Sequence, residues 1–309
     1  MRQAFIDVNG ALTKVMAWGR WIEEPPETNE PEDIIICIPG NPGITKFYTV
    51  FLQRIHEELN CPVWILSHAG HEVVKNTNSD SDEYNNDKLY GLDDQIEHKE
   101  EFVKKYVPEN ARVYFIGHSV GAYIITELLK IPTVSQKVLG NYFLFPTVEY
   151  IGDTPNGRFI KYVFPFIPVL VVLAWVFQIL PSSFQSPLVN FFMHFRGIPK
   201  MHQKTFVDFV HPHILKQVFH LARQEMDGIK ERNNNVFSKF KSKIKLYYST
   251  TDGWVPLTFR DNVKRDFPDI DAEICSRGFE HAFVLKHSRD MGEMVSSWIK
   301  ESKSKDNLN

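Results

Sequence analysis

Short apolar runs alternate with helical patterns along most of the chain. Ile34–Ile38 is a β-branched run between Asp33 and Pro39, typical of a strand buried on both faces. The expected strands are 4–8, 11–18, 34–38, 63–67, 112–117, 141–145, 245–249 and 272–275, and the expected helices are 45–59, 92–107, 120–131 and 288–300. This order predicts an α/β fold, with a mostly parallel sheet covered by helices on both faces.

Other segments connect or interrupt these elements. Asn9-Gly10 separates the first two strands and predicts a two-residue hairpin turn, because both turn positions need positive φ. The polar segment 75–88 predicts a mobile loop, and the charged end 304–309 a disordered tail. The alternation stops between Pro146 and Lys243, which predicts a core of residues 1–149 and 243–303 and a cap insertion of residues 150–242.

Composition narrows the class of protein. The 309 residues are 43% hydrophobic and 24% charged, which excludes collagen, coiled coil and general disorder, and the net charge of −3 gives no basic field for nucleic acid. Cys37, Cys61 and Cys275 lie far apart and form no zinc motif or disulfide framework. The first residues lack the pattern of a signal peptide. We therefore expect a protein of the reducing cytosol without a metal.

Gly117-His118-Ser119-Val120-Gly121 fits the G-x-S-x-G pattern between a predicted strand and a predicted helix. In that context a sharp turn exposes the serine hydroxyl, and the flanking glycines prevent collisions. The pattern predicts Ser119 as a nucleophile; a buried serine at an ordinary strand–helix junction is the alternative. His118 is expected to point away from the site and to be structural.

A nucleophilic serine needs a histidine base and an acid, in the chain order Ser, Asp, His for this arrangement. Asp252 follows the strand 245–249 and His281 follows the strand 272–275, so Ser119, Asp252 and His281 are predicted as catalytic residues. A turn-forming aspartate and a surface histidine are the alternatives. Glu149 is the reserve acid.

The turn Pro39–Gly43 directly follows the strand 34–38. Because Pro42 has no N–H, the expected oxyanion donors are the backbone amides of Asn41 and Val120. A plain Pro/Gly turn is the alternative.

Several of these motifs together resemble a known family. IPGNPG (38–43), SHAGH (67–71), YGLDDQIEHK (90–99), GHSVGAY (117–123), LFPTVE (144–149), SPLVNFF (186–192) and DFPD (266–269) resemble the lipid droplet-associated hydrolases of the α/β-hydrolase superfamily. The resemblance implies an α/β-hydrolase fold, a Ser119–Asp252–His281 triad, and a location on lipid droplets and the cytosolic face of the endoplasmic reticulum membrane. It also implies neutral lipid substrates, among them sterol esters.

Residues 162–195 contain no Asp, Glu, Lys or Arg. Pro165 and Pro168 interrupt the first helical stretch, so we expect a broken helix pair that docks on a membrane or droplet surface without crossing it. A buried lid and a transmembrane span are the alternatives, and a span would put Ser119 and Asp252 on opposite sides. The expected docking residues are Phe164, Phe166, Val169, Leu170, Val171, Val172, Leu173, Trp175, Val176, Phe177, Phe191 and Phe192.

The sequence therefore predicts a serine hydrolase that needs no cofactor and acts on lipid esters through an acyl-enzyme. The competing hypothesis is a droplet-surface protein with little or no turnover that organises droplets or binds partners. An epoxide hydrolase is disfavoured, because it requires an aspartate in place of Ser119.

Overall fold

The computed structural model describes residues 1–28, 30–73 and 88–306. These residues form an eight-stranded sheet in the order β1-β2-β4-β3-β5-β6-β7-β8. The strands are β1 (Arg2–Val8), β2 (Ala11–Trp18), β3 (Asp33–Ile38), β4 (Val63–Leu66), β5 (Arg112–His118), β6 (Val138–Leu144), β7 (Ile244–Tyr248) and β8 (Asp271–Ile274). β1, β2 and β4 pair antiparallel and the other neighbours pair parallel, which confirms the predicted mostly parallel sheet.

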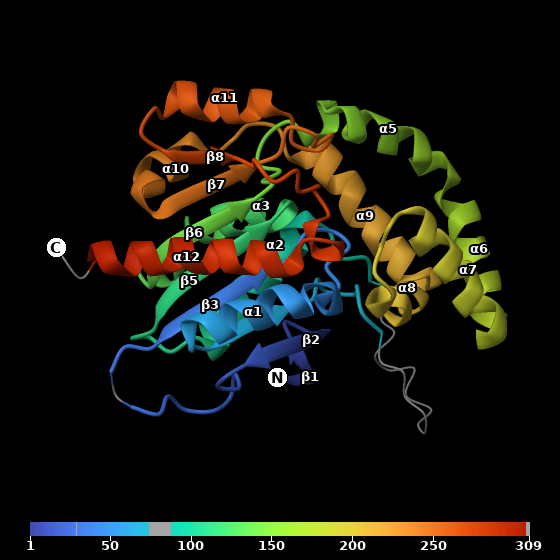
Figure 1. The fold of residues 1–309 in the computed structure, drawn as a ribbon, viewed down its shortest axis with the longest axis horizontal. Helices are drawn as coiled ribbons and strands as arrows, with labels where there is room; N and C mark the ends of the chain where they lie inside the picture. Colours follow the sequence, from blue (N-terminus) through green and yellow to red (C-terminus); the bar gives the residue numbers. More distant parts are fainter. Residues whose placement is uncertain (29, 74–87, 307–309) are drawn as a thin grey trace.

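Helices cover both faces of this sheet (Figure 1). The helices outside the cap are α1 (Thr49–Leu59), α2 (Leu92–Tyr106), α3 (Val120–Leu128), α4 (Pro132–Ser135), α10 (Asn234–Phe240), α11 (Leu257–Asp266) and α12 (Ser288–Asp306). α2, α3, α10 and α11 contribute to one apolar core, and α1 and α12 to the core on the opposite face. Both cores contain residues of the central strands, which are therefore buried on both sides, as their apolar runs predict.

The structure confirms the predicted turn of the hairpin and differs from the prediction for part of the C-terminal segment. Asn9 and Gly10 have φ values of 51° and 71°, which confirms the predicted turn between β1 and β2. The predicted disordered tail is wrong for residues 304–306, because α12 continues to Asp306. Lys300 and Lys303 in this last part of the helix pair with Glu58 and Asp33, so it is tied to the body of the protein. Residues 307–309 and all but residue 88 of the predicted mobile loop lie outside the described residues.

Most of the insertion between β6 and β7 forms a cap at one end of the sheet (Figure 1), whereas α10, which lies within the predicted cap of residues 150–242, packs in a core of the body. The cap contains α5 (Pro155–Val163), the short helix η4 (Phe164–Phe166), α6 (Ile167–Ile179), α7 (Ser182–Phe195), α8 (Gln203–Phe209) and α9 (Pro212–Gly228). α9 lies between the body and α6, and α6 packs along it. The part of the insertion that stands away from the sheet is α6 and α7. α9 packs against the body, and α5 and α8 also contact it, through the bond from the Asn156 N–H to the carbonyl oxygen of Gly253 and through the rings of Phe206 and Phe47.

Candidate active site

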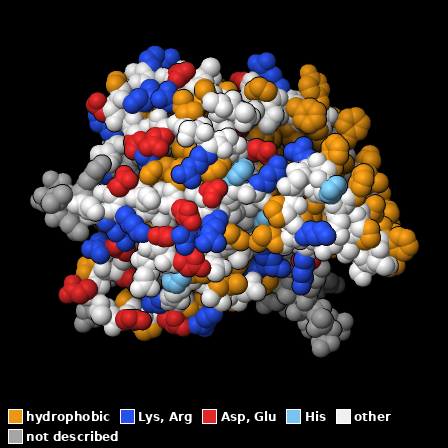
Figure 2. Space-filling view, in the orientation of Figure 1, with side chains coloured by type: hydrophobic (Ala, Val, Ile, Leu, Met, Phe, Trp, Pro, Cys, Tyr) orange, Lys and Arg blue, Asp and Glu red, His pale blue; other side chains and the backbone are white. Residues whose placement is uncertain are grey.

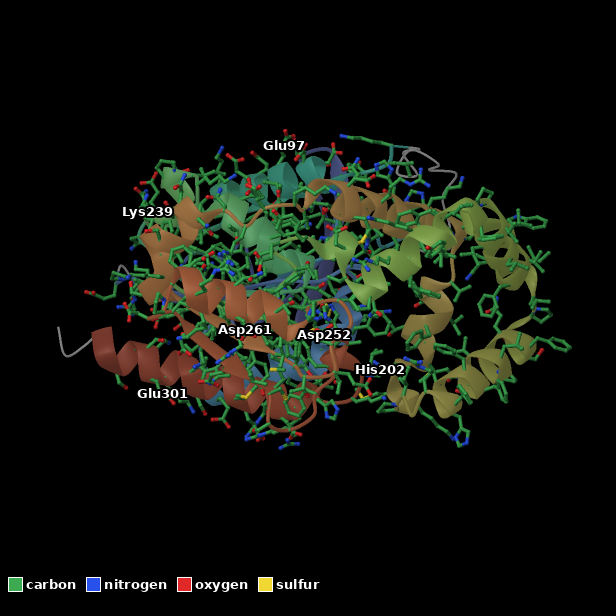
Figure 3. The ribbon with its side chains drawn as sticks, turned by 90° about the horizontal axis from the view of Figure 1, so that it is seen from above. Glu97, His202, Lys239, Asp252, Asp261 and Glu301 are labelled. Carbon is green, nitrogen blue, oxygen red and sulfur yellow. The ribbon has the colours of Figure 1, made fainter. Side chains whose placement is uncertain are left out.

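The three residues expected to form a triad each follow a parallel strand. Ser119 follows β5, Asp252 follows β7 and His281 follows β8. Because the carboxyl ends of parallel strands meet at one edge of the sheet, the chain brings the three side chains together there. Figure 3 places Asp252 at the side of the body that faces the cap helices.

A continuous chain of hydrogen bonds joins these side chains. His281 Nδ1 lies 2.7 Å from Asp252 Oδ2, and His281 Nε2 lies 3.0 Å from Ser119 Oγ. A carboxylate only accepts hydrogen bonds, so Nδ1 carries the proton and Nε2 accepts from the serine hydroxyl. The other carboxylate oxygen of Asp252 accepts from the backbone N–H groups of Trp254 and Val255, at 2.8 and 3.1 Å. Asp252 is thereby held rigidly, and so is the imidazole it orients.

The backbone at Ser119 has the geometry of a strained strand-to-helix turn. Ser119 has φ 53° and ψ −123°, a conformation that a residue with a side chain rarely adopts. A Cβ on Gly117 would lie 2.7 Å from Ala122 Cα, and one on Gly121 would collide with the carbonyl oxygen of Ile38. Both glycines of the pattern are therefore required for the turn to form against β3.

The turn after β3 lies directly against Ser119. A Cβ on Gly40 would lie 2.9 Å from Ser119 Cβ. Among the hydrogen bonds of the described residues, none uses the backbone N–H of Asn41 or of Val120 as a donor. The two predicted oxyanion donors thus belong to segments in contact. Asn41 lines the cavity next to Ser119, whereas Val120 is fully buried and is not among the residues that line it.

Ser119 and His281 open into an apolar cavity of about 340 Å³ under the cap. The walls combine residues of the turn, the cap helices and the loop after β8; the apolar ones include Ile44, Phe47, Ile160, Phe206, Phe209, Val218, Phe219, Met226, Trp254 and Leu285. Such a cavity suits a hydrocarbon chain next to Ser119.

His118 connects two loops of the site. Its Nε2 donates to the carbonyl oxygen of His281 at 2.9 Å, so its Nδ1 accepts from the hydroxyl of Tyr48 at 2.6 Å. Tyr48 in turn accepts from the backbone N–H of Gly40 at 2.9 Å. Burial, and to a lesser extent His281, lower the pKa of His118 to about 3, so the ring is neutral at physiological pH. The expectation that His118 points away is wrong, because its ring lines the cavity beside Ser119.

The hydrogen-bonded triad does not include Glu149, His68 or His71. Glu149, the reserve acid, accepts from Arg232 at 3.3 Å and has no hydrogen bond with His281. His68 and His71 do not line the cavity; His71 Nδ1 donates to the carbonyl oxygen of Pro42 at 2.6 Å, and His68 packs under Gly43. Both histidines therefore support the turn after β3. Among the described residues, no cluster of His, Cys, Asp or Glu has the arrangement of a metal site.

Glu225 is the site residue that the sequence reasoning missed. It lies on α9, lines the cavity, and accepts from the side-chain amide of Asn41 at 2.9 Å. Burial raises its pKa to about 8. A signal for it existed in the helical period, which places Glu225 on the same buried face as Ile214 and Leu221.

The cap carries a large apolar surface, which appears in orange along the right edge of Figure 2. The predicted docking residues that are exposed are Phe166, Val169, Val172, Leu173, Trp175, Val176, Phe191 and Phe192. Those only partly exposed are Phe164, Leu170, Val171 and Phe177. We call the exposed set, together with Tyr162 and Phe195 (77% and 82% exposed), the apolar cap face.

The segment Pro155–Ile179 is long and apolar enough to cross a membrane, with a mean hydropathy of 2.2 over its most apolar window. Only 6% of that window is buried inside the structure, which argues against the alternative of a fully buried lid. Exposure of so much apolar surface is unfavourable in water, so this face needs an apolar partner.

Comparisons with known proteins give matches in both sequence and structure. Residues 31–284 match the family described as lipid-droplet associated hydrolase. Curated proteins with the name lipid droplet-associated hydrolase are similar over almost the whole chain: that of Drosophila melanogaster is 35% identical, covering 97% of this chain and 99% of its own, and that of Mus musculus is 33% identical, covering 97% and 95%.

Solved structures show the fold at much lower identity. An N-formylmaleamic acid deformylase from Pseudomonas putida has a TM-score of 0.63 at 12% identity, covering 96% of this chain and 99% of its own. A haloalkane dehalogenase from Bradyrhizobium elkani has a TM-score of 0.62 at 11% identity, covering 98% and 99%. This likeness confirms the predicted α/β-hydrolase fold.

Proposed function

The chain belongs to the lipid droplet-associated hydrolase family, and from this premise we propose that it is a serine hydrolase of lipid esters that works at the droplet surface. The observation that carries the proposal is the hydrogen-bonded chain Ser119–His281–Asp252 in the wall of an apolar cavity. Hydrolysis by this chain needs no cofactor.

The reaction follows from the geometry. Ser119 Oγ attacks the ester carbonyl while His281 Nε2 takes its proton, and Asp252 stabilises the imidazolium. The amides of Asn41 and Val120 receive the negative charge that develops on the carbonyl oxygen. His281 then protonates the leaving alcohol, and a water molecule repeats these steps to release the acid from Ser119.

The substrate class in this proposal is a sterol ester or another neutral lipid ester. The cavity next to Ser119 is mostly apolar, and a lipid ester carries its polar atoms only at the bond that is cleaved. A long acyl chain would occupy the apolar part of the cavity and place its carbonyl at the serine.

The apolar cap face docks the enzyme on its substrate source in this proposal. Arg158 and Lys161 lie before this face in the chain and Arg196 and Lys200 after it, and all four are exposed. Basic side chains at both ends of an apolar surface suit a phospholipid layer, whose headgroups they contact while the apolar residues reach the acyl region. Because α6 packs on α9 and α7 on α8, the face stays attached to the body. This supports docking on the cytosolic face of droplets and of the endoplasmic reticulum membrane rather than a span.

The experiment that tests catalysis is labelling with a fluorophosphonate probe, with and without a neutral-lipid emulsion, followed by mapping of the labelled residue. We expect the label on Ser119, its loss in Ser119→Ala and His281→Ala, and normal labelling of Ser183→Ala, an exposed cap serine that serves as the control. A folded wild-type protein without label under both conditions would contradict the proposal and favour the non-catalytic droplet protein.

Docking is tested separately by flotation with droplets of triacylglycerol coated with phospholipid. The double variant Trp175→Ser/Phe191→Ser should float at least tenfold less than wild type. Ile274→Ser removes an apolar side chain that is exposed on β8, outside the cap, and should float normally. Equal flotation of all three proteins would contradict the docking role of the cap face.

A further inference from the structure

The cap helix α9 is hydrogen-bonded to the turn after β3 through the side chain of Asn41. The two hydrogens of this side-chain amide are both used: one is donated to the carbonyl oxygen of Val218 and one to Glu225 Oε1, each at 2.9 Å. Both acceptors belong to α9. The amide oxygen of Asn41 is buried and has no hydrogen-bond partner among the described residues, so these two bonds alone orient the side chain.

Asn41 also carries one of the two proposed oxyanion donors, its backbone N–H. The side chain and the backbone of one residue move together, and Gly40 beside it lies against Ser119. A donor stabilises an oxyanion only when it lies at hydrogen-bond distance from the atom where charge develops, so a small rotation of this turn weakens the transition state. The orientation of Asn41 is therefore a condition for catalysis.

We propose that Glu225 is a positioning residue that holds Asn41 from the cap helix α9 and so aims the Asn41 backbone N–H at the oxyanion. This inference rests on the proposed function, and it names the residue through which the cap acts on the reaction. Because α6 packs along the same helix, the α6 part of the apolar cap face and the oxyanion turn both contact α9.

The environment of Glu225 fits this role. Glu225 is 4% exposed and lines the mostly apolar cavity, and burial raises the pKa of its carboxyl group to about 8. At neutral pH it is an uncharged acid that accepts from Asn41 without placing a negative charge beside the oxyanion. Glutamine has the same shape and the same carbonyl acceptor, whereas methionine has a similar volume and no acceptor.

A matched control exists on the same helix. Gln217 is fully buried on α9, accepts from the backbone N–H of Tyr90 at 3.0 Å and donates to the carbonyl oxygen of Lys88 at 2.7 Å. It anchors α9 to the body at a position that does not touch Asn41. Gln217→Met therefore measures how stability and kcat change when α9 loses hydrogen bonds to the body that do not involve Asn41.

The experiment compares wild type, Glu225→Met, Glu225→Gln and Gln217→Met on a soluble p-nitrophenyl ester, with circular dichroism as a check of folding. We expect kcat of Glu225→Met to fall about ten- to a hundredfold with KM within threefold, because only transition-state stabilisation is lost. Glu225→Gln should keep kcat within threefold of wild type. Gln217→Met should unfold at a lower temperature and keep its kcat.

Three results would overturn this inference. They are a kcat of Glu225→Met within twofold of wild type, a loss in Gln217→Met as large as in Glu225→Met, and a loss in Glu225→Gln as large as in Glu225→Met. In each case wild type still hydrolyses the ester and is labelled on Ser119, so the proposed function stands. A wild-type protein with neither turnover nor label overturns both.

Discussion

His118→Phe is expected to destabilise the protein by disconnecting two loops of the active site. The phenylalanine ring keeps the contacts that His118 makes with the surrounding aromatic rings of Tyr48, Phe145 and Phe283. It removes both hydrogen bonds, to the hydroxyl of Tyr48 and to the carbonyl oxygen of His281. Two buried polar groups then lose these partners.

The size of the effect follows from these two groups. A buried group that loses its partner costs about 1–3 kcal/mol. The hydroxyl of Tyr48 still accepts from the backbone N–H of Gly40, so we expect the lower part of the summed range, a fall of about 2–4 kcal/mol in the free energy of unfolding at pH 7.5. Equilibrium urea denaturation measures this loss. Tyr48→Phe removes the same Tyr48–His118 bond by deleting the other partner. The sum of the stability losses in the two single variants should therefore exceed the stability loss in the double variant by about 1 kcal/mol.

A pH series adds a second, independent signature. The folded pKa of His118 is about 3 and its unfolded pKa is about 6.5, so below pH 6.5 the unfolded chain binds the extra proton and stability is lost as pH falls. The advantage of wild type over His118→Phe should therefore shrink by about 2–3 kcal/mol between pH 6.5 and 4.5. A loss below 0.5 kcal/mol at pH 7.5, strict additivity, or a difference that does not depend on pH would refute the reasoning.

Three further perturbations test other parts of the structure. Glu225 has a folded pKa of about 8 against 4.5 in the unfolded chain, so wild-type stability falls as pH rises through this window. The free energy of unfolding of Glu225→Gln relative to wild type should therefore rise by about 4 kcal/mol between pH 5 and 9 in thermal or urea unfolding. Gly43 has φ 70°, and a Cβ there would collide with the ring of His68. The free energy of unfolding of Gly43→Ala should therefore be about 2–4 kcal/mol lower than that of wild type, and the fluorophosphonate probe should label its Ser119 more slowly; unchanged stability and labelling would contradict this packing. Burial lowers the pKa of Lys99 well below its usual range, so the unfolded chain binds more protons and wild type should gain stability over Lys99→Met as pH rises from 6 to 9; a gap that stays constant would show that Lys99 is charged in the folded state.

The sheet and the strand-end residues could be predicted because local patterns and one rule of topology suffice for them. Apolar runs mark the buried strands, and residues that follow parallel strands converge at one edge. Ser119, Asp252 and His281 meet for this reason although they are far apart in the chain. Their catalytic role stays a proposal until the labelled residue is mapped.

The link between Asn41 and Glu225 could not be predicted in the same way. The two residues are 184 positions apart, and their contact depends on the angle at which α9 crosses the turn after β3. The helical period predicts the buried face of α9. It does not predict the angle between α9 and the turn, which depends on the packing of the whole insertion. The orientation of His118 depends similarly on Tyr48, which comes from a different segment.

The exposed face of α6 is unpredictable for another reason. Apolar residues surround this helix on all sides, so its sequence contains no polar stripe to mark the surface. Ala174 is buried while Trp175 next to it is 57% exposed, and only the contact of α6 with α9 distinguishes them. The half-buried positions Phe164 and Phe177 could not be separated from the exposed ones for the same reason.

The place of the insertion in the chain has a consequence for synthesis on the ribosome. β6 and β7 are neighbours in the sheet, yet the whole insertion is made between them, and His281 is made later still. Domains fold as their chain emerges, and contacts between distant segments form late. The helices of the cap face therefore leave the ribosome while the sheet lacks β7 and β8. In the proposed function, the docking surface is thus made before the histidine that the serine needs, so a chain that docks during synthesis would do so before it can be active.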